Sequence, residues 1–509
     1  MKLIQKPVRS QSGVSVVAVM TAPRKCRHGT CTFCPGGPGS VFGDVPQSYT
    51  GREPNPRRAA RNLYDPYMQV FNRLEQYIVT GHLPEKVELI IMGGTFPSYP
   101  LEYQHEFVAY LFKALNDFSS LFMRQGRIDM QAFKGFFELP GDIQDESRAR
   151  RLHEKMLSLK GKYSGSMLAH EQLRNEKAAS RCIALCIETK PDWCMQPHIS
   201  QILQQGATRV ELGIQTIYDE ILKLTNRGHT NQDSILATRL LKDSFMKVGY
   251  HAMPGLPDVS REMDMKALQE YIDNPDYRPD AFKLYPCMVL KGTTLYNQWK
   301  QGKFTPITTA EAASIITDFK KIVPEYVRIM RVQRDIPTNM TDAGVDKTNL
   351  RQYVGQLARE KGVACRCIRC REPKGRSIAI DNVKIKAASY EASKGTEIFI
   401  AAEDLQQDIL VGFCRLRIPY MPFRPEITQG TAGIRELHVY GKAVPLGKKD
   451  STALQHQGFG SQLLAEAEKI AREQYDARKM LVISGVGAKE YYRKFGYKTD
   501  GVYVSKTLD

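Results

Sequence analysis

The sequence predicts an α/β protein in which a parallel (β/α)6 barrel is followed by a smaller α/β domain. Apolar, β-branched runs of strand length alternate with helical stretches from about residue 14 to 300. That alternation is typical of βα units around a parallel sheet. Six units fit into this stretch, enough for a partial or complete barrel. A second, shorter alternation begins at about residue 377.

The barrel elements follow in order along domain 1–300. Residues 14–20 are the first expected strand, and a cysteine- and glycine-rich loop follows to about residue 51. The stretch 118–178 is long and charged for one connection, so we expect a helical insertion there. Further strands are expected at 87–92, 182–188, 209–214, 248–253 and 281–285. Helices are expected at about 57–80, 102–117, 145–178, 197–205, 231–247 and 262–273.

Residues 301–376 are expected to connect the two domains. The segment 321–376 holds 13 Lys and Arg against 6 Asp and Glu, which favours a basic connector over a third core. The second domain is then 377–509. Its strands are expected at 396–401, 408–418, 434–440, 480–484 and 501–506, and its helices at 458–475 and 488–495.

The composition limits the class of protein. Hydrophobic residues make up 42% and charged residues 25%, which excludes a disordered chain, a collagen and a disulfide scaffold. No apolar run approaches the ~18 residues of a membrane span, and the N-terminus lacks a signal-peptide core. We therefore expect a soluble, cytoplasmic protein. The net charge of +17 favours a polyanionic partner such as nucleic acid, with a generic basic surface as the alternative.

The eleven cysteines cluster, which indicates metal ligands before disulfides. Cys26, Cys31 and Cys34 stand in the run C-R-H-G-T-C-T-F-C after the first strand. Three thiolates on one short loop can hold three irons of a 4Fe–4S cube and leave the fourth iron open to a substrate. A zinc knuckle completed by His28, or a redox pair, is the alternative.

A second cysteine cluster lies in the basic connector. Cys365, Cys367 and Cys370 are close enough for one metal, and zinc is the default for tight thiolate clusters. Such a metal would pin the connector between the domains. Cys287, a histidine or water are candidates for the fourth ligand. We interpret Cys182, Cys186 and Cys194 as small core residues.

A glycine loop, Q-H-Q-G-F-G at 455–460, directly precedes an expected helix. Its backbone N–H groups would form a pyrophosphate site at the helix N-terminus. The pattern resembles the acetyl-CoA loop of GCN5-related acetyltransferases (GNAT).

The first cysteine motif resembles the radical SAM superfamily, although its spacing is C-x4-C-x2-C instead of C-x3-C-x2-C. Longer first spacings occur in the branch formed by the catalytic subunit of Elongator and its archaeal and bacterial relatives. The resemblance runs from about residue 7 to 506, so we expect the basic N-terminal extension of many members to be missing. The other motifs that carry it are M-G-G-T (92–95), E-T-K-P-D (188–192), E-L-G-I-Q (211–215), N-R-G-H-T (226–230), M-P-G-L-P (253–257), K-L-Y-P (283–286), R-V-Q-R-D-I-P (331–337), R-E-L-H-V-Y-G (435–441), Q-H-Q-G-F-G (455–460) and Y-Y-R-K-F-G-Y (491–497).

The resemblance implies a radical SAM partial TIM-like barrel with a GNAT domain, and the cofactors 4Fe–4S, S-adenosylmethionine (SAM) and acetyl-CoA. It also implies a tRNA uridine carboxymethyltransferase that acts on carbon 5 of the wobble uridine. In that reaction the cluster cleaves SAM to a 5′-deoxyadenosyl radical, which takes hydrogen from the methyl of acetyl-CoA. The acetyl-CoA radical adds to uracil, and electron loss and thioester hydrolysis complete the product. The barrel mouth should then face the thioester pocket across a large domain contact.

The resemblance also assigns residues to SAM. Gly93 and Gly94 would meet its amino group, and Glu188 and Gln215 its other polar groups. Lys283 would meet SAM or the acyl-CoA carbonyl, because a lysine in an apolar barrel is costly unless paired. A salt bridge with a barrel glutamate is the alternative for Lys283.

On the second domain, the resemblance places Tyr491 and Tyr492 near the thioester, with packing residues as the alternative. Glu436 is a candidate general base, or else a structural acid paired with Arg435 or His438. The complete expected acetyl-CoA set is Glu436, Leu437, His438, Val439, Gln457, Gly458, Phe459, Gly460, Ser461, Tyr491 and Tyr492.

Arginines can bind the phosphates of tRNA, and tyrosines such as Tyr49, Tyr64 and Tyr67 can stack on unpaired bases. A solvated basic face is the alternative. The candidate arginines are Arg52, Arg57, Arg58, Arg61, Arg328, Arg331, Arg334, Arg366 and Arg369.

Two rival functions remain at the level of sequence: a protein (histone) lysine acetyltransferase with a structural cluster, and a tRNA-binding scaffold with degenerate sites. A homodimer or an Elongator-like assembly also remains open.

Overall fold

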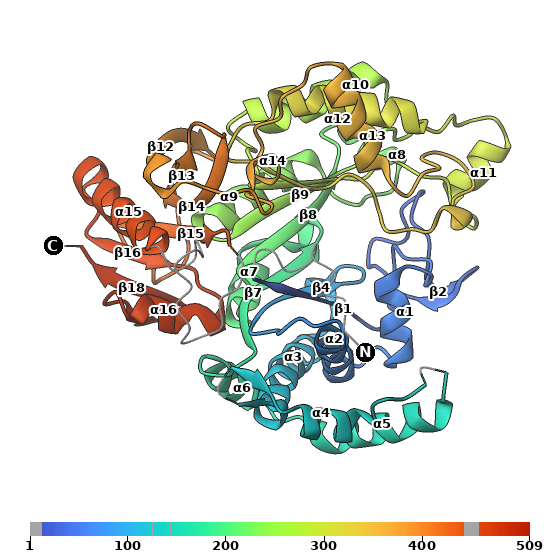
Figure 1. The fold of residues 1–509 in the computed structure, drawn as a ribbon. Coiled ribbons are helices and arrows are strands. Elements are labelled where there is room, and N and C mark those ends of the chain that lie inside the picture. The colour runs from blue at the N-terminus through green and yellow to red at the C-terminus, as the bar shows by residue number, and fades with distance from the viewer. Residues whose placement is uncertain (1–12, 125, 143, 442–457, 509) are drawn as a thin grey trace.

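Seven parallel strands form the first sheet of the protein. The structure is a computed structural model, and it describes residues 13–124, 126–142, 144–441 and 458–508 (Figure 1). The sheet order is β1-β4-β7-β8-β9-β10-β11, and no pairing joins β1 to β11 in the described part of the chain, so the barrel is open. The strands are β1 Ser15–Met20, β4 Lys86–Met92, β7 Arg181–Thr189, β8 Arg209–Gln215, β9 Lys247–Ala252, β10 Ala281–Leu284 and β11 Arg328–Arg331.

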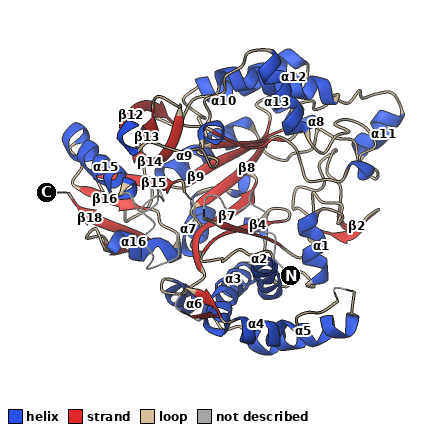
Figure 2. Cartoon of the chain, in the orientation of Figure 1, coloured by secondary structure: helices blue, strands red, loops and turns tan. Residues whose placement is uncertain are grey.

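Helices cover the outer face of this curled sheet (Figure 2). Each connection between neighbouring strands carries one or more of them, as parallel pairing requires. Local signals start them: Asp65 caps α2 by accepting from the Met68 N–H at 3.0 Å, and Pro66 occupies its first turn. The helices are α1 Pro54–Arg61, α2 Pro66–Val79, α3 Leu101–Phe122, α7 Gln196–Gln204, α8 Asp219–Leu224, α9 Asn231–Asp243, α10 Arg261–Asp273, α11 Thr294–Lys300, α12 Thr309–Ile322, α13 Leu350–Glu360 and α14 Ile368–Arg371.

The sheet has one strand more than the sequence predicted. β11 and the whole of α12 lie in the segment 301–376 that was expected to be a connector, yet Ile329 is buried in the same core as Phe282 and Phe319. The strand is four residues long with an arginine at each end. Its apolar content is too low to predict a strand, and pairing with β10 decides its conformation.

Three described helices lie between α3 and β7, where the sequence predicted a helical insertion. It contains α4 Met130–Phe137, α5 Glu146–Lys160 and α6 Met167–Asn175, together with the short hairpin β5 Met123–Arg124 and β6 Arg127–Ile128. Helices α5 and α6 were expected as one, but Gly161 ends α5 at a positive φ of 64°. Another short hairpin, β2 Gly37–Ser40 and β3 Gly43–Val45, follows the cysteine loop.

The second sheet belongs to the C-terminal domain and has the order β12-β13-β14-β15-β16-β18-β17. Among the described strands of this sheet, only β15 and β16 are parallel neighbours. The edge strand β12 was not predicted, because most of its side chains are exposed and it lacks an apolar run. The elements are β12 Val383–Ala392, β13 Gly395–Asp404, β14 Ile409–Ile418, β15 Thr431–Val439, α15 Phe459–Tyr475, β16 Lys479–Val482, α16 Lys489–Arg493, β17 Lys498–Asp500 and β18 Tyr503–Thr507.

The two domains meet at the amino-terminal ends of the barrel strands. Arg435 of β15 donates to the Met246 carbonyl at 2.7 Å, just before β9, and Tyr503 donates to the Ser244 carbonyl at 3.1 Å. The two domains are therefore in contact, as the sequence predicted. The place of this contact corrects the expectation that the barrel mouth faces the second domain, because the cysteine loop follows β1 at the opposite, carboxyl-terminal end (Figure 1).

None of the helices in the described ranges is both long and apolar enough to cross a membrane.

Candidate functional site

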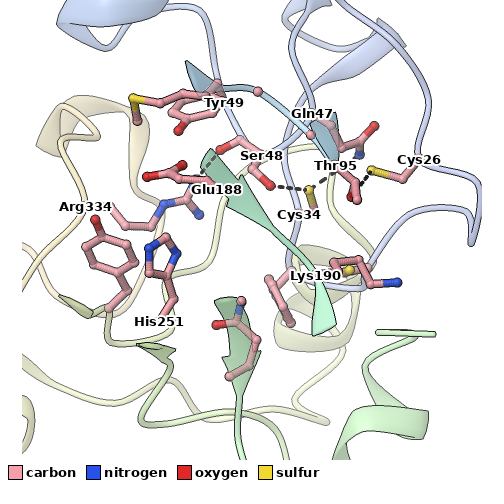
Figure 3. Close-up of a pocket in the computed structure, with 18 of the residues that line it drawn as sticks. Cys26, Cys34, Gln47, Ser48, Tyr49, Thr95, Glu188, Lys190, His251 and Arg334 are labelled. Carbon is pink, nitrogen blue, oxygen red and sulfur yellow. Dashed lines mark hydrogen bonds between the residues drawn. The ribbon is translucent and has the colours of Figure 1, made fainter. Parts of the chain in front are cut away.

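A pocket opens at the carboxyl ends of the barrel strands, where barrel proteins carry their chemistry (Figure 3). All three cysteines of the first cluster line it. So do the predicted SAM residues Gly93, Gly94, Glu188 and Gln215. Segments that lie between Cys26 and Ile336 in the sequence thus converge on one cavity.

The cysteine loop presents its sulfurs to hydrogen-bond donors. Ser48 Oγ lies 3.3 Å from Cys34 Sγ, and Gln47 Nε2 donates to the same sulfur at 3.5 Å. Burial, together with Cys34, raises the pKa of the Cys26 thiol to about 11. A cation that binds all three sulfurs would reverse this shift. Three thiols that line one pocket, with hydrogen-bond donors beside them, fit a thiolate-bound iron–sulfur cluster.

The glycines of M-G-G-T are held where a side chain would not fit. Gly93 has φ +105°, and a Cβ there would lie 2.6 Å from Thr21 Oγ1. Gly94 has φ +69°, and a Cβ would lie 2.8 Å from the Tyr99 hydroxyl. Bare backbone therefore lines this wall of the pocket.

Gln215 carries strain at the end of β8. Its φ is +68°, which a non-glycine residue rarely adopts, and its buried Oε1 has no hydrogen-bond partner. A buried unpaired acceptor in a pocket indicates a ligand that donates to it.

Lys283 lies beneath the pocket. Its Nζ is 2.6 Å from Glu188 Oε1 and also forms an ion pair with Glu211. Burial opposes the charged ammonium, but the two carboxylates outweigh it and hold the pKa of Lys283 well above its usual range. The salt-bridge alternative therefore describes this lysine, while Glu188 itself faces the cavity.

Glu211 gathers the other charges of the barrel interior. Arg209 Nη2 is 3.2 Å from Glu211 Oε1, and His251 Nε2 is 3.0 Å from Oε2. Glu188, Glu211 and His251 are close enough to bind a metal ion, but the Lys283 ammonium already supplies the positive charge.

Several pocket residues were not predicted for this site. Lys190 and Tyr285 belong to quoted motifs and could have been found there, whereas nothing local marks His251. Arg331 and Arg334, predicted to bind RNA, also line the cavity. Arg334 donates to the Ser48 carbonyl next to the cysteine loop.

The second domain has an opening of its own between β15 and β16. These parallel strands pair only from Thr431 to Ile434, although β15 continues to Val439. No described strand pairs with this edge of β15 beyond Ile434, a stretch that includes the predicted residues Glu436, Leu437, His438 and Val439. Among the described residues, its backbone groups there are left for an extended ligand.

Helix α15 begins beside this opening. Gly458 precedes it at φ +80°, and its first turn holds no acidic residue, so its N–H groups can bind an anion. A Cβ at Gly460 would lie 2.6 Å from the Tyr491 hydroxyl, which places this tyrosine at the glycine loop. Tyr491 is 38% exposed, whereas Tyr492 is buried in the domain core. Phe459 and Ser461 lie in the same helix start, and the predicted Gln457 lies outside the described residues.

Glu436 does not have the environment of a general base. It forms ion pairs with Lys247 and, at 2.9 Å, with Arg415. Burial would raise its pKa, but the two cations lower it to about 2. The expected pairing with Arg435 is not found, because Arg435 binds Asp280 and Glu397.

His438 lies next to Glu436 on β15. Burial lowers its pKa to about 4, so it is neutral at pH 7, and its buried Nε2 has no partner. A neutral imidazole with a free nitrogen can accept a proton or a hydrogen bond.

The second cysteine cluster converges as predicted. The sulfurs of Cys365, Cys367 and Cys370 lie within 4.8 Å of one another. Lys320 donates to Cys370 Sγ at 3.3 Å. Cys287 packs with Cys31 and Cys34 in a different core, so it is excluded as a fourth ligand.

The predicted RNA-binding arginines divide by exposure. Arg52, Arg57 and Arg61 are exposed, and none of them forms an ion pair with a described residue. Arg58 is buried and donates to the Ala18 carbonyl, and Arg328 is occupied by Glu372 and Tyr440.

The remaining residues that were predicted to bind RNA also differ in exposure. Arg366 is exposed but pairs with Glu325 and Asp408, and Arg369 is half-buried. Tyr67 stacks on Phe71 in the core and is not available to bases.

The fold and the two sites define a radical SAM protein joined to a GNAT-type acetyltransferase domain. Residues 161–270 match the Radical SAM superfamily, 279–359 its C-terminal domain, and 365–497 the Acetyltransferase (GNAT) family. The chain is 48% identical to the tRNA uridine(34) acetyltransferase of Methanocaldococcus jannaschii, over 100% of this chain and 87% of that one. It is 40% identical to Elongator complex protein 3 of Bos taurus, over 100% and 86%.

A solved structure agrees in fold. The archaeal Methanocaldococcus infernus Elp3 with an N-terminus deletion (1-46) matches with a TM-score of 0.78 and 42% identity, over 98% of this chain and 100% of that one. The chain therefore belongs to the Elongator complex protein 3 family.

Proposed function

We propose that this protein is a tRNA-modifying radical SAM enzyme that uses acetyl-CoA to install a carboxymethyl group on carbon 5 of the wobble uridine. One observation carries the proposal: a chain similar over its full length to proteins named tRNA uridine(34) acetyltransferase keeps both the cysteine pocket and the acetyltransferase opening. Neither a plain acetyltransferase nor a plain radical SAM enzyme needs both.

Cys26, Cys31 and Cys34 would hold a 4Fe–4S cluster, which supplies one electron to SAM. Gly93 and Gly94 would admit the SAM amino group to bare backbone. Gln215 would accept a hydrogen bond from it through the unpartnered Oε1. Lys283 fixes the Glu188 carboxylate at the pocket edge and so orients it.

In the second domain, the N–H groups at the start of α15 would bind the pyrophosphate of acetyl-CoA. The free edge of β15 would bind its extended arm, and Tyr491 would lie near the thioester. The acyl group must then reach the cysteine pocket from the amino-terminal end of the barrel. Arg52, Arg57 and Arg61 would bind tRNA phosphates, and Cys365, Cys367 and Cys370 would hold a structural zinc ion.

Mass spectrometry of tRNA nucleosides tests this function. The iron-reconstituted full chain is incubated without oxygen with SAM, acetyl-CoA, tRNA and a strong reductant. We expect carboxymethyluridine from the wild type and from Cys182→Ala, a buried cysteine outside the pocket. We expect none from the Cys26/Cys31/Cys34→Ala variant. Acetylated lysine on a protein substrate without SAM, and no modified uridine, would support the rival lysine acetyltransferase and overturn the proposal.

A further inference from the structure

The segment 225–228, between α8 and α9, lies against the cysteine loop although almost 200 residues separate them. The Thr32 N–H donates to the Thr225 carbonyl at 3.1 Å. Asn226 Nδ2 donates to the Thr30 carbonyl at 2.9 Å. These bonds hold the loop on both sides of Cys31.

Arg227, from the N-R-G-H-T motif, reaches the sulfur itself. Its Nη1 donates to Cys31 Sγ at 3.3 Å, and its Nη2 donates to the Gly213 carbonyl at 2.6 Å. The side chain is 7% exposed, and its Nε has no hydrogen-bond partner. In the part of the chain that the structure describes, Arg227 forms no ion pair with a carboxylate.

A buried guanidinium with no carboxylate is costly unless another anion lies beside it. The sulfur of Cys31 is the group within reach, and it becomes anionic when it binds iron. His28 Nε2 lies 3.4 Å from the same sulfur, but an imidazole is charged only when it is protonated, whereas a guanidinium is always charged. Arg227 is therefore the permanent positive charge on this ligand.

We propose that Arg227 is a positioning residue that raises the reduction potential of the iron–sulfur cluster held by Cys26, Cys31 and Cys34. Reduction adds one electron to the cluster and changes no covalent bond. An N–H donor and a buried positive charge at a ligand sulfur stabilise the more negative, reduced state. Through Gly213 the same guanidinium ties the cluster ligand to β8, the strand that carries Gln215.

This inference rests on the proposed cluster but not on acetyl-CoA or RNA. The test is a redox titration of the iron-reconstituted full chain with a dithionite-type reductant, followed by electron paramagnetic resonance. The variants are Arg227→Met and Arg227→Lys. Arg27→Met is the matched control, because Arg27 is on the same loop but lies over the Trp193 ring at 5.2 Å. We expect the midpoint of Arg227→Met to be more negative than wild type, that of Arg227→Lys to lie between them, and that of Arg27→Met to be unchanged.

Equal midpoints for wild type and Arg227→Met would overturn the inference, as would an equal shift in Arg27→Met. If Arg227→Met binds less iron and sulfide than wild type, Arg227→Gln replaces it in the comparison with Arg227→Lys. Gln keeps a hydrogen-bond donor but has no charge, so the midpoint of Arg227→Gln should be more negative than that of Arg227→Lys. If both variants have the same midpoint as wild type, the inference is overturned. Shifted midpoints without any carboxymethyluridine would support Arg227 and overturn only the proposed function.

Discussion

The two ends of the barrel both bury charged groups, but they use them differently. At the amino-terminal end, Asp280 is fully buried and surrounded by Arg435 at 2.6 Å, Arg415 at 3.4 Å and Lys242 at 4.0 Å. At the carboxyl-terminal end, Gln215 and Arg227 each keep a buried polar atom without a partner. Charges that join the domains are neutralised by other charged groups of the protein, whereas at the pocket Arg227 pairs with no described carboxylate and Gln215 keeps an unpartnered acceptor for a ligand.

The difference teaches which buried polar groups are structural. A buried ion that has its counter-ions is destabilising only when one partner is removed. A group whose partner is a ligand can be changed at little cost to the fold, and its loss is felt in binding. The following substitutions test this contrast, from the largest expected effect on stability to the smallest.

Asp280→Ala should cause the largest loss. It leaves Arg435, Arg415 and Lys242 without their shared carboxylate, and removing one partner from a buried pair costs about 3–5 kcal/mol. The measurement is the free energy of unfolding in denaturant. Arg261→Met, which breaks the more exposed pair with Asp318, is the control and should cost at most about 1 kcal/mol. Similar losses for both variants would contradict the contrast.

Glu436→Gln should cost about 1.5–3 kcal/mol at pH 7, because charged hydrogen bonds to Lys247 and Arg415 are lost. The folded-state pKa of Glu436 is about 2, below the ordinary 4.5. Its contribution is therefore fully present above pH 4.5 and is lost as pH falls towards 2. Unfolding measured along this pH range should show the two proteins converge. If the difference in unfolding free energy between wild type and Glu436→Gln stays constant down to pH 2, Glu436 does not titrate in this range and the prediction is wrong.

Asp264→Asn tests a carboxyl near the pocket. Burial raises the pKa of Asp264 from 3.8 to about 7, against a hydrogen bond from the Gly255 N–H at 2.8 Å. Because the folded pKa is the higher one, this group's contribution is present below pH 3.8 and is lost as pH rises through 7. The variant should match wild type at pH 4 and be about 1–3 kcal/mol more stable at pH 8. The measurement is thermal unfolding of both proteins at pH 4 and pH 8. The same stability difference between variant and wild type at both pH values would refute the prediction.

Cys26→Ala should change the unfolding free energy of the iron-free protein by less than about 0.5 kcal/mol, because this half-buried thiol lies in the pocket and not in the core. The same variant should lose its 4Fe–4S absorption after reconstitution. A large loss of stability without iron would mean that the loop cysteines are structural.

Local sequence patterns predicted much of the fold and the three cysteines of the pocket. The apolar run of β8 and the capped helix α10 agree with their expected positions within about two residues, because burial on one face imposes a period on the sequence. Cys26, Cys31 and Cys34 were predictable since their spacing is itself the signal. β11 and β12 were missed, because short or exposed strands owe their conformation to their neighbours.

The sequence by itself determined the order of most elements, the two domains and the three cysteines that line the pocket, because these depend on contacts within a few residues. Only the tertiary structure decided that Glu436 belongs to an interdomain ion pair, that Arg227 reaches Cys31, and that the second domain meets the amino-terminal end of the barrel. Each of these contacts joins segments that are far apart in the sequence and meet only in the folded protein. The sequence around a charged residue therefore does not indicate which distant residue it will pair with.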